Sequence, residues 1–135
     1  ANTMLIEEFV LYSSEKNGDI QFSNPPQNER IMLHGHCHQK SLVGTDPALA
    51  VLGMIPGLES SEIPSGCCGM AGSFGFDVNH YDISMKMGEL SLFPTIREQG
   101  NDATIVTEGV SCRQQIKDGT GRSSKHLVEI LSKYI

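Results

Sequence analysis

The sequence contains no tryptophan, only three tyrosines and five phenylalanines, and no long apolar run. A membrane-spanning helix needs about 18 or more consecutive apolar residues, so none is expected. Lysine and arginine number 10 against 16 acidic residues, which gives a net charge of −6. Without a basic run, that charge argues against nucleic acid or an acidic membrane surface as a partner. We therefore expect neither.

Cysteine is scarce too, with four in 135 residues, well below the roughly 8–10% typical of a small disulfide scaffold. No signal peptide is visible, so the expected compartment is the cytoplasm, where thiols stay reduced. Structural disulfides are therefore not expected. The four thiols remain available for metal or redox chemistry.

Two of the cysteines, Cys67 and Cys68, are adjacent and lie between Gly66 and Gly69, with Gly72 three residues further on. A disulfide between neighbouring cysteines requires a distorted geometry and stores strain. Glycine on both sides lets the backbone bend sharply and leaves room for a bulky group. A tight turn under a packed helix is the plainer alternative for these glycines.

The other two cysteines are distant in sequence. Cys37 has 29 residues between it and Cys67, and 43 residues separate Cys68 from Cys112. The apolar runs 30–34 and 103–107 and the extended segment 59–64 each come just before a cysteine loop. Since open α/β sheets place ligands at the carboxyl ends of their strands, the loops are expected to converge. The predicted fold is α/β: a small, mostly parallel sheet flanked by helices in a Rossmann-like three-layer arrangement.

Helices are expected between these segments. The first begins near Thr3, which would cap it. The second starts with Asp46 as its N-cap and Pro47 at its first position. A third, capped by Asp77 or Asn79, is interrupted near 88–94, and a fourth starts at 111–112. The last runs from His126 to 134, with His126 as its cap.

The three motifs HGHCHQKSL, SGCCGMAGSFGF and SCRQQI, followed by GTGR, occur in this order. They resemble the CCG cysteine-rich domain of heterodisulfide reductase and of the glycolate oxidase iron–sulfur subunit. They are closer to the C-terminal domain of FAD-linked oxidases that carry a fused iron–sulfur domain. The resemblance runs from about Arg30 to the C-terminus. One feature departs from the family, since Gly109 stands where many members have the first cysteine of a final C-x-x-C pair. The departure puts an unusual non-cubane cluster in doubt and favours electron relay.

The resemblance implies one domain over 1–135, with a leading helix and loop at 1–29 and the motif-bearing core at 30–135. Because the sequence opens on Ala1, we expect an excised C-terminal fragment of a larger flavoprotein. The implied role is electron transfer for an FAD-linked dehydrogenase or oxidase of a D-lactate-, glycolate- or 2-hydroxyglutarate-like acid. FAD would lie in the missing portion. Its partners would be the flavin and ferredoxin-like domains and a quinone or cytochrome acceptor, with peripheral association at the inner face of the membrane.

A [4Fe–4S] cluster takes four cysteine ligands, and the chain has four. The predicted metal ligands are Cys37, Cys67, Cys68 and Cys112. Free backbone N–H groups of the glycine loop could donate to sulfur and raise the reduction potential. The predicted cofactor-binding residues are Gly66, Gly69, Gly72, His36, His38 and Arg113.

The histidines allow more than one interpretation. His34, His36 and His38 alternate along the chain, so on an extended segment they would share a face and could ligate metal or donate hydrogen bonds. Each one alone is as readily explained as a structural histidine. Zinc also accepts Cys₄ or Cys/His sets, although most zinc sites use C-x-x-C pairs. A metal-free dithiol and a structural docking module also stay open at this point.

Overall fold

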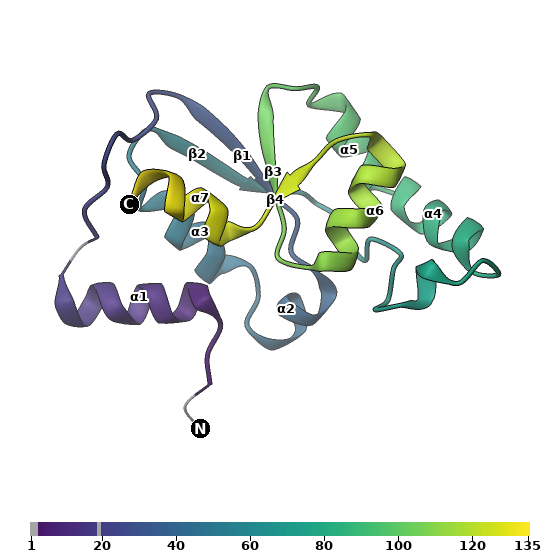
Figure 1. Ribbon diagram of the computed structural model, residues 1–135, viewed down its shortest axis with the longest axis horizontal. Helices are drawn as coiled ribbons and strands as arrows, with labels where there is room; N and C mark the ends of the chain where they lie inside the picture. The colour runs from purple at the N-terminus through teal and green to yellow at the C-terminus, as the bar shows by residue number, and fades with distance from the viewer. Residues whose placement is uncertain (1–2, 19) are drawn as a thin grey trace.

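A computed structural model describes residues 3–18 and 20–135. It contains a sheet of four parallel strands in the order β2-β1-β3-β4. The strands are β1 (Glu29–Leu33), β2 (Leu58–Glu62), β3 (Ala103–Val106) and β4 (Ser124–Lys125). The prediction of a small parallel sheet flanked by helices is confirmed (Figure 1).

Helices cover both faces of the sheet (Figure 1). In chain order they are α1 (Ile6–Asn17), α2 (Cys37–Leu42), α3 (Asp46–Gly53), the short 3₁₀ helix η1 (Phe74–Phe76), α4 (Tyr81–Glu89), α5 (Leu92–Glu98), α6 (Val110–Thr120) and α7 (Leu127–Tyr134). Helices α3 and α7 lie on one face, and α5 and α6 lie on the other. Helix α1 packs outside, against α3.

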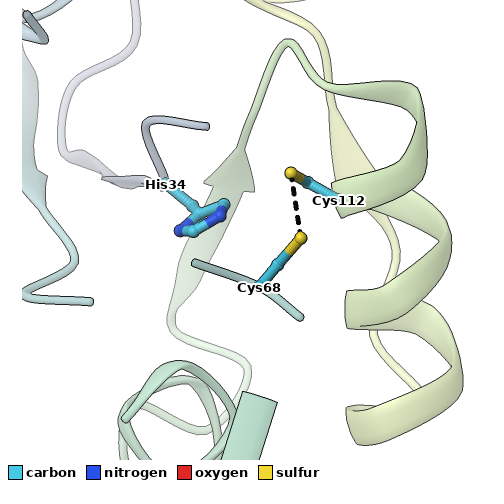
Figure 2. Close-up of side chains that lie close together, drawn as sticks. All are labelled: His34, Cys68 and Cys112. Carbon is cyan, nitrogen blue, oxygen red and sulfur yellow. Dashed lines mark hydrogen bonds between the residues drawn. The ribbon is translucent and has the colours of Figure 1, made fainter. Parts of the chain in front are cut away.

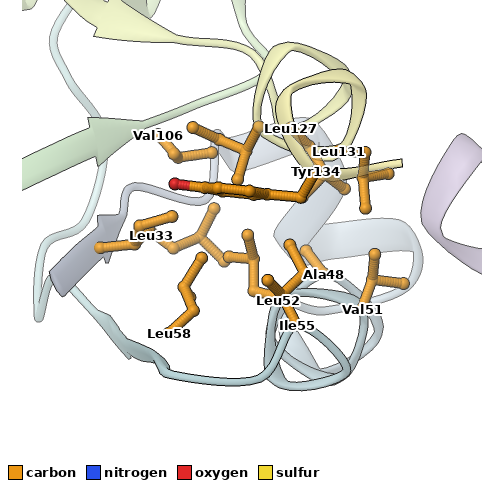
Figure 3. Packing of buried hydrophobic residues seen from close by; sticks show 12 residues of the cluster. Leu33, Ala48, Val51, Leu52, Ile55, Leu58, Val106, Leu127, Leu131 and Tyr134 are labelled. Atoms are coloured by element: carbon orange, nitrogen blue, oxygen red, sulfur yellow. The ribbon is translucent and has the colours of Figure 1, made fainter. Parts of the chain in front are cut away.

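Alternation along the strands divides the core in two, because successive side chains of a strand point to opposite faces. Ile31 and Leu33 of β1 pack with α3 and α7, in the cluster drawn in Figure 3. Met32, between them, packs on the opposite face with Phe93 of α5 and Ile116 of α6. Burial on both faces explains why β1 and β3 are continuous apolar runs in the sequence.

The strand order creates a switch point between β1 and β3. From β1 the chain passes to β2 on one side, and from β3 it passes to β4 on the other. In such sheets the crevice at the carboxyl ends of the two central strands is the usual ligand site. Helix α2, which begins with Cys37, follows β1, and α6, which contains Cys112, follows β3.

Several element boundaries differ from the predictions. Thr3 does not cap α1, which begins at Ile6; the first-turn Glu8 carboxylate instead accepts from the Leu5 backbone N–H at 2.8 Å. Helix α3 has Thr45 as its N-cap, so Asp46 is its first residue. The prediction for His126 is confirmed: its ring accepts from the Val128 N–H at 3.2 Å.

The ring of Phe93 packs against two helical glycines, Gly88 of α4 and Gly119 of α6. This close packing gives a test of the core. A Cβ on Gly88 of α4 would lie 2.3 Å from the Phe93 ring, whereas one on Gly53 of α3 would meet nothing within 4 Å. We expect Gly88→Ala to lower the free energy of unfolding by about 1–3 kcal/mol through overpacking. Gly53→Ala should raise it by up to about 1 kcal/mol, because alanine favours the helix. Urea unfolding measures both, and equal shifts would contradict the packing.

Candidate metal centre

Three of the four cysteines line one cavity at the carboxyl edge of the sheet. It has a volume of about 250 Å³, and its walls include Cys37, Cys68 and Cys112 from three separate loops. Cys67, which precedes Cys68 in the chain, is half-buried and is not part of the cavity lining. Cys68 and Cys112 are buried, whereas Cys37 is exposed. The structure therefore brings the three cysteine motifs together at the switch point.

At the centre of this group, the Sγ atoms of Cys68 and Cys112 lie 3.2 Å apart. The two thiols approach each other from the CCG loop and from the first turn of α6, and the ring of His34 lies beside them (Figure 2). Ligand atoms of His34, Cys68 and Cys112 all lie within 4.8 Å of one another, and all three residues are buried. Two sulfurs bound to one tetrahedral metal at about 2.3 Å would lie roughly 3.8 Å apart, so a small movement would accommodate an ion here.

Position and environment mark His34 as a candidate ligand. Its Nδ1 lies 2.9 Å from Ser65 Oγ, and its Nε2 is buried without a hydrogen-bond partner in the described part of the chain. A buried polar nitrogen without a partner is costly. A ring anchored through one nitrogen with the other free is the usual arrangement of a metal-binding histidine.

The Sγ atoms of Cys68 and Cys112 are in hydrogen-bonding contact, and this contact shifts their pKa values in opposite directions. The contact with Cys112 is the largest cause that lowers the pKa of Cys68; burial opposes it, and a hydrogen bond with His34 acts in the same direction as Cys112. The contact with Cys68, together with burial, raises the pKa of Cys112. Cys68 is therefore the more acidic thiol of the pair, and the thiolate is the form that binds metal.

The backbone after the paired cysteines curls around the Cys67 sulfur. The Gly69 N–H donates to it at 3.3 Å, and the Ala71 N–H also contributes a hydrogen bond. Burial is the larger influence and raises the pKa of Cys67, while these two N–H groups lower it. Gly69 and Ala71 both have positive φ, at 100° and 43°. Glycine adopts a positive φ without strain, whereas at Ala71 it is strained backbone, which often marks functional sites.

Two polar side chains hold the loops together. Gln115 of α6 donates to the Cys68 carbonyl at 3.0 Å and to the Ser84 carbonyl at 3.0 Å, which joins the CCG loop to α4 and α6. Lys40 of α2 donates to the Ser65 carbonyl at 2.8 Å and pairs with Glu62 at 2.7 Å. These bonds fix the Cys37 and Cys112 helices against the loop between them.

The three histidines of the first motif do not share a face, as an extended segment would require. The chain turns into α2 at Cys37, so His34 is buried below the cavity while His38 is exposed. His36 and His38 both line the cavity, with ring centroids 6.2 Å apart. Burial is the largest cause that lowers the pKa of His36. Sequence reasoning proposed His36 and His38 and left His34 undistinguished, although its place at the end of a buried strand was a usable signal.

The remaining predicted cofactor-binding residues lie at different distances from the cavity. Gly72 lines it, whereas Gly66 does not and is exposed. Arg113 faces a separate cavity between α6 and β4 and pairs with Glu129 at 3.4 Å. The roles of all three stay predictions.

Gly109, where many members of the resembled family have a cysteine, also lines the cavity. A Cβ built there would lie 2.9 Å from Cys112 Sγ and 3.2 Å from His36 Cβ. A side chain at 109 would thus enter the site. In this chain the position supplies space instead of a fifth thiol.

The chain is similar to segments of two kinds of dehydrogenase. It is 35% identical over 104 residues to a subunit of the anaerobic glycerol-3-phosphate dehydrogenase of Escherichia coli K12, a match that covers 77% of this chain and 26% of that protein. It is 30% identical over 135 residues to the D-2-hydroxyglutarate dehydrogenase of the same strain, covering 99% of this chain and 13% of that protein. The Pantoea ananatis D-2-hydroxyglutarate dehydrogenase matches over the same shares at 27% identity.

The chain thus spans about a quarter or less of these curated relatives. No family model matches it, and no solved structure matches it. The similarity therefore relates the chain to one part of larger dehydrogenases. In residues 3–18 and 20–135, no helix has the length and apolar character to cross a bilayer.

Proposed function

We propose that this chain is the iron–sulfur electron-transfer domain of an FAD-linked dehydrogenase or oxidase of a 2-hydroxyacid such as D-lactate, glycolate or 2-hydroxyglutarate. The observation that carries the proposal is the single cavity lined by Cys37, Cys68 and Cys112, with Cys67 beside it. A cubane cluster takes four thiolate ligands, and these four cysteines supply them. The cluster supplies one-electron transfer; the protein supplies ligands, donors to sulfur and a rigid frame.

The donor chemistry of the site fits such a cluster. Thiolates bind iron, and the contact with Cys112 lowers the pKa of Cys68, which favours its thiolate form. N–H groups directed at a ligand sulfur, such as those of Gly69 and Ala71 on Cys67, stabilise its negative charge. Partial exposure of Cys37 leaves one side of the site open to an electron partner.

The similarity to two kinds of dehydrogenase supports an oxidoreductase role for the whole protein. In this proposal, substrate is oxidised at FAD in another domain, and electrons pass through ferredoxin-like clusters and this domain to a quinone or cytochrome. The protein works in the cytoplasm or at the inner face of the membrane. This domain alone has no dehydrogenase activity.

A zinc site is the second candidate, and one observation favours it. The buried group His34, Cys68 and Cys112 offers three ligand atoms within 4.8 Å, which is a donor set zinc accepts. Cys37 or Cys67 would complete a tetrahedron. In this alternative the domain is a structural module without redox activity.

Metal analysis of protein produced and purified without oxygen separates the two. We expect iron and acid-labile sulfide in equal amounts, close to four of each per chain as a [4Fe–4S] cluster requires, with visible charge-transfer absorption that bleaches on reduction. Stoichiometric zinc without iron would overturn the proposal in favour of the structural module. Preparation without oxygen is essential, because clustered thiols oxidise readily.

A further inference from the structure

The leading helix α1 docks through a carboxylate. Glu7 is its only fully buried residue, with 0% of its surface exposed. Its Oε1 accepts from the Nε2 of Gln39 at 2.9 Å, and Gln39 is in turn the only fully buried residue of α2. Helices α1 and α2 therefore contact each other through a buried glutamate and a buried glutamine, in addition to the apolar contacts that Val10 and Leu11 of α1 make with the core.

A second carboxyl group lies against the first. The Glu108 carboxyl is within hydrogen-bonding reach of Glu7, and one oxygen of each group, Glu7 Oε2 and Glu108 Oε1, is buried without a donor in the described residues. Two carboxylates cannot donate to each other, so the contact is favourable only when they share a proton. Burial first, and Glu7 second, raise the pKa of Glu108 to about 7.

No lysine or arginine in the described ranges neutralises this pair. The nearby cations are engaged elsewhere: Lys40 of α2 pairs with Glu62, and Arg113 of α6 pairs with Glu129. His36, the N-cap of α2, interacts electrostatically with Glu7, and burial lowers the pKa of its ring. A shared proton is therefore the available counter-charge.

The pair lies between the two loops that frame the cavity. Glu108 directly precedes Gly109, which lines the cavity, and Gln39 follows Cys37 by two residues. Glu7 also acts electrostatically on His36, another residue of the cavity wall. Charge added to the cavity therefore acts on two carboxyl groups that each have a buried oxygen without a donor in the described residues.

We propose that the Glu7–Glu108 pair is a redox-linked proton-exchange site, which takes up one proton when the centre in the cysteine cavity accepts an electron. The inference rests on the proposed iron–sulfur function. A one-electron donor, the flavin-side domain in the protein or dithionite in the test, reduces the centre. One proton from solvent then binds a carboxylate oxygen of the pair, and both leave on reoxidation. No bond other than that O–H bond forms or breaks.

The test is a redox titration of the anaerobically prepared, iron-loaded chain from pH 6 to 9. The midpoint potential should be constant below about pH 7 and fall above it. Where one proton is taken up per electron, the midpoint potential falls by about 59 mV per pH unit, which corresponds to a tenfold change in the equilibrium constant. Glu108→Gln should abolish the fall, because its amide donates to Glu7 without exchanging a proton. Glu59→Gln, at an exposed position on β2, should retain it.

A second measurement needs no cluster. Because the folded pKa of Glu108 is raised from 4.5 to about 7, folded protein holds more protons than unfolded protein in that window. Stability should then fall as pH rises from about 4.5 to about 7, by more in the parent chain than in Glu108→Gln. Glu7→Gln should reduce this pH dependence of stability by less, because burial, the larger cause of the raised pKa of Glu108, remains. It tests the pair if Glu108→Gln does not fold.

The outcomes are distinguishable. A potential that falls above pH 7 in the parent chain and Glu59→Gln but not in Glu108→Gln supports the coupling. An iron-loaded chain with a pH-independent potential, or a fall that survives Glu108→Gln, overturns the coupling and leaves the proposed function intact. No stability difference between parent and both variants also overturns it. Protein that contains no iron or sulfide overturns the proposed function and the coupling together.

Discussion

Cys68→Ser and Cys112→Ser should each reduce the iron and sulfide content of the anaerobically prepared chain by roughly tenfold or more. Loss of even an outer-shell partner costs about 10–100-fold in metal affinity, and these substitutions remove a ligand. A serine hydroxyl does not ionise near neutral pH, so it cannot replace the thiolate. Each change also breaks the 3.2 Å contact between the two sulfurs.

His34→Asn is the variant that separates the two candidate metals. Asparagine can keep a hydrogen bond to Ser65 while it removes the free ring nitrogen. If four cysteines hold a cluster, His34→Asn should reduce iron content far less than either cysteine variant, because no ligand is lost. If His34, Cys68 and Cys112 hold zinc, His34→Asn should weaken binding as strongly as either cysteine variant.

His80→Asn is the matched control, since His80 lies outside the cavity lining and outside the buried group and stacks on Phe74 instead. It should leave metal content unchanged in both cases. Iron retained in Cys68→Ser and Cys112→Ser together would contradict the ligand assignment. Far-UV circular dichroism of each variant confirms that the fold survives the change.

The sheet could be predicted because its central strands are buried on both faces. The apolar residues at 31–33 of β1 and 105–106 of β3 indicate buried strands, and a cysteine motif follows each strand within a few residues. β4 has only two residues, Ser124 and Lys125, with no apolar signal, so it was missed. Its pairing to β3 depends on where α6 ends, and the sequence does not encode that contact locally.

Helix α2 shows why the candidate site was predicted only in part. The stretch after His36 is polar, and its alternating histidines suggested an extended segment. The structure forms a helix there instead, with Gln39 as the buried residue. That turn separates His34 from His36 and His38. It leaves His34 beside the sulfurs of Cys68 and Cys112, a position that its spacing in the sequence does not indicate.

The acid pair was beyond sequence reasoning for a different reason. Glutamates in a polar helix and in a loop are normally solvated, and Glu7 and Glu108 are far apart in the chain. Only the packing of α1 over α2 and the β3–α6 loop brings them together. Their significance follows from burial and from the missing donors, which are properties of the fold.

Gly69→Ala should be the most damaging substitution in the glycine loop. Gly69 has φ of +100°, and a Cβ there would lie 2.2 Å from the Ser84 carbonyl oxygen and 3.1 Å from Gln115 Nε2. The oxygen belongs to the backbone of α4 and cannot move aside as a flexible side chain would. Strained backbone costs about 1–3 kcal/mol and overpacking about 1–3 kcal/mol more. We expect a loss of roughly 2–6 kcal/mol in the free energy of unfolding.

Gly72→Ala supplies the comparison, because Gly72 also has a positive φ, +71°, but nothing lies within 4 Å of the added carbon. It should cost only about 1–2 kcal/mol, the steric penalty of the left-handed conformation. Urea unfolding of the two variants gives the difference directly. The added carbon at 69 would also displace the N–H that donates to Cys67 and the Gln115 bond to the Cys68 carbonyl. Gly69→Ala should therefore lose iron as well as stability, and equal effects from the two variants would show that the close approach to Ser84 does not hold the loop.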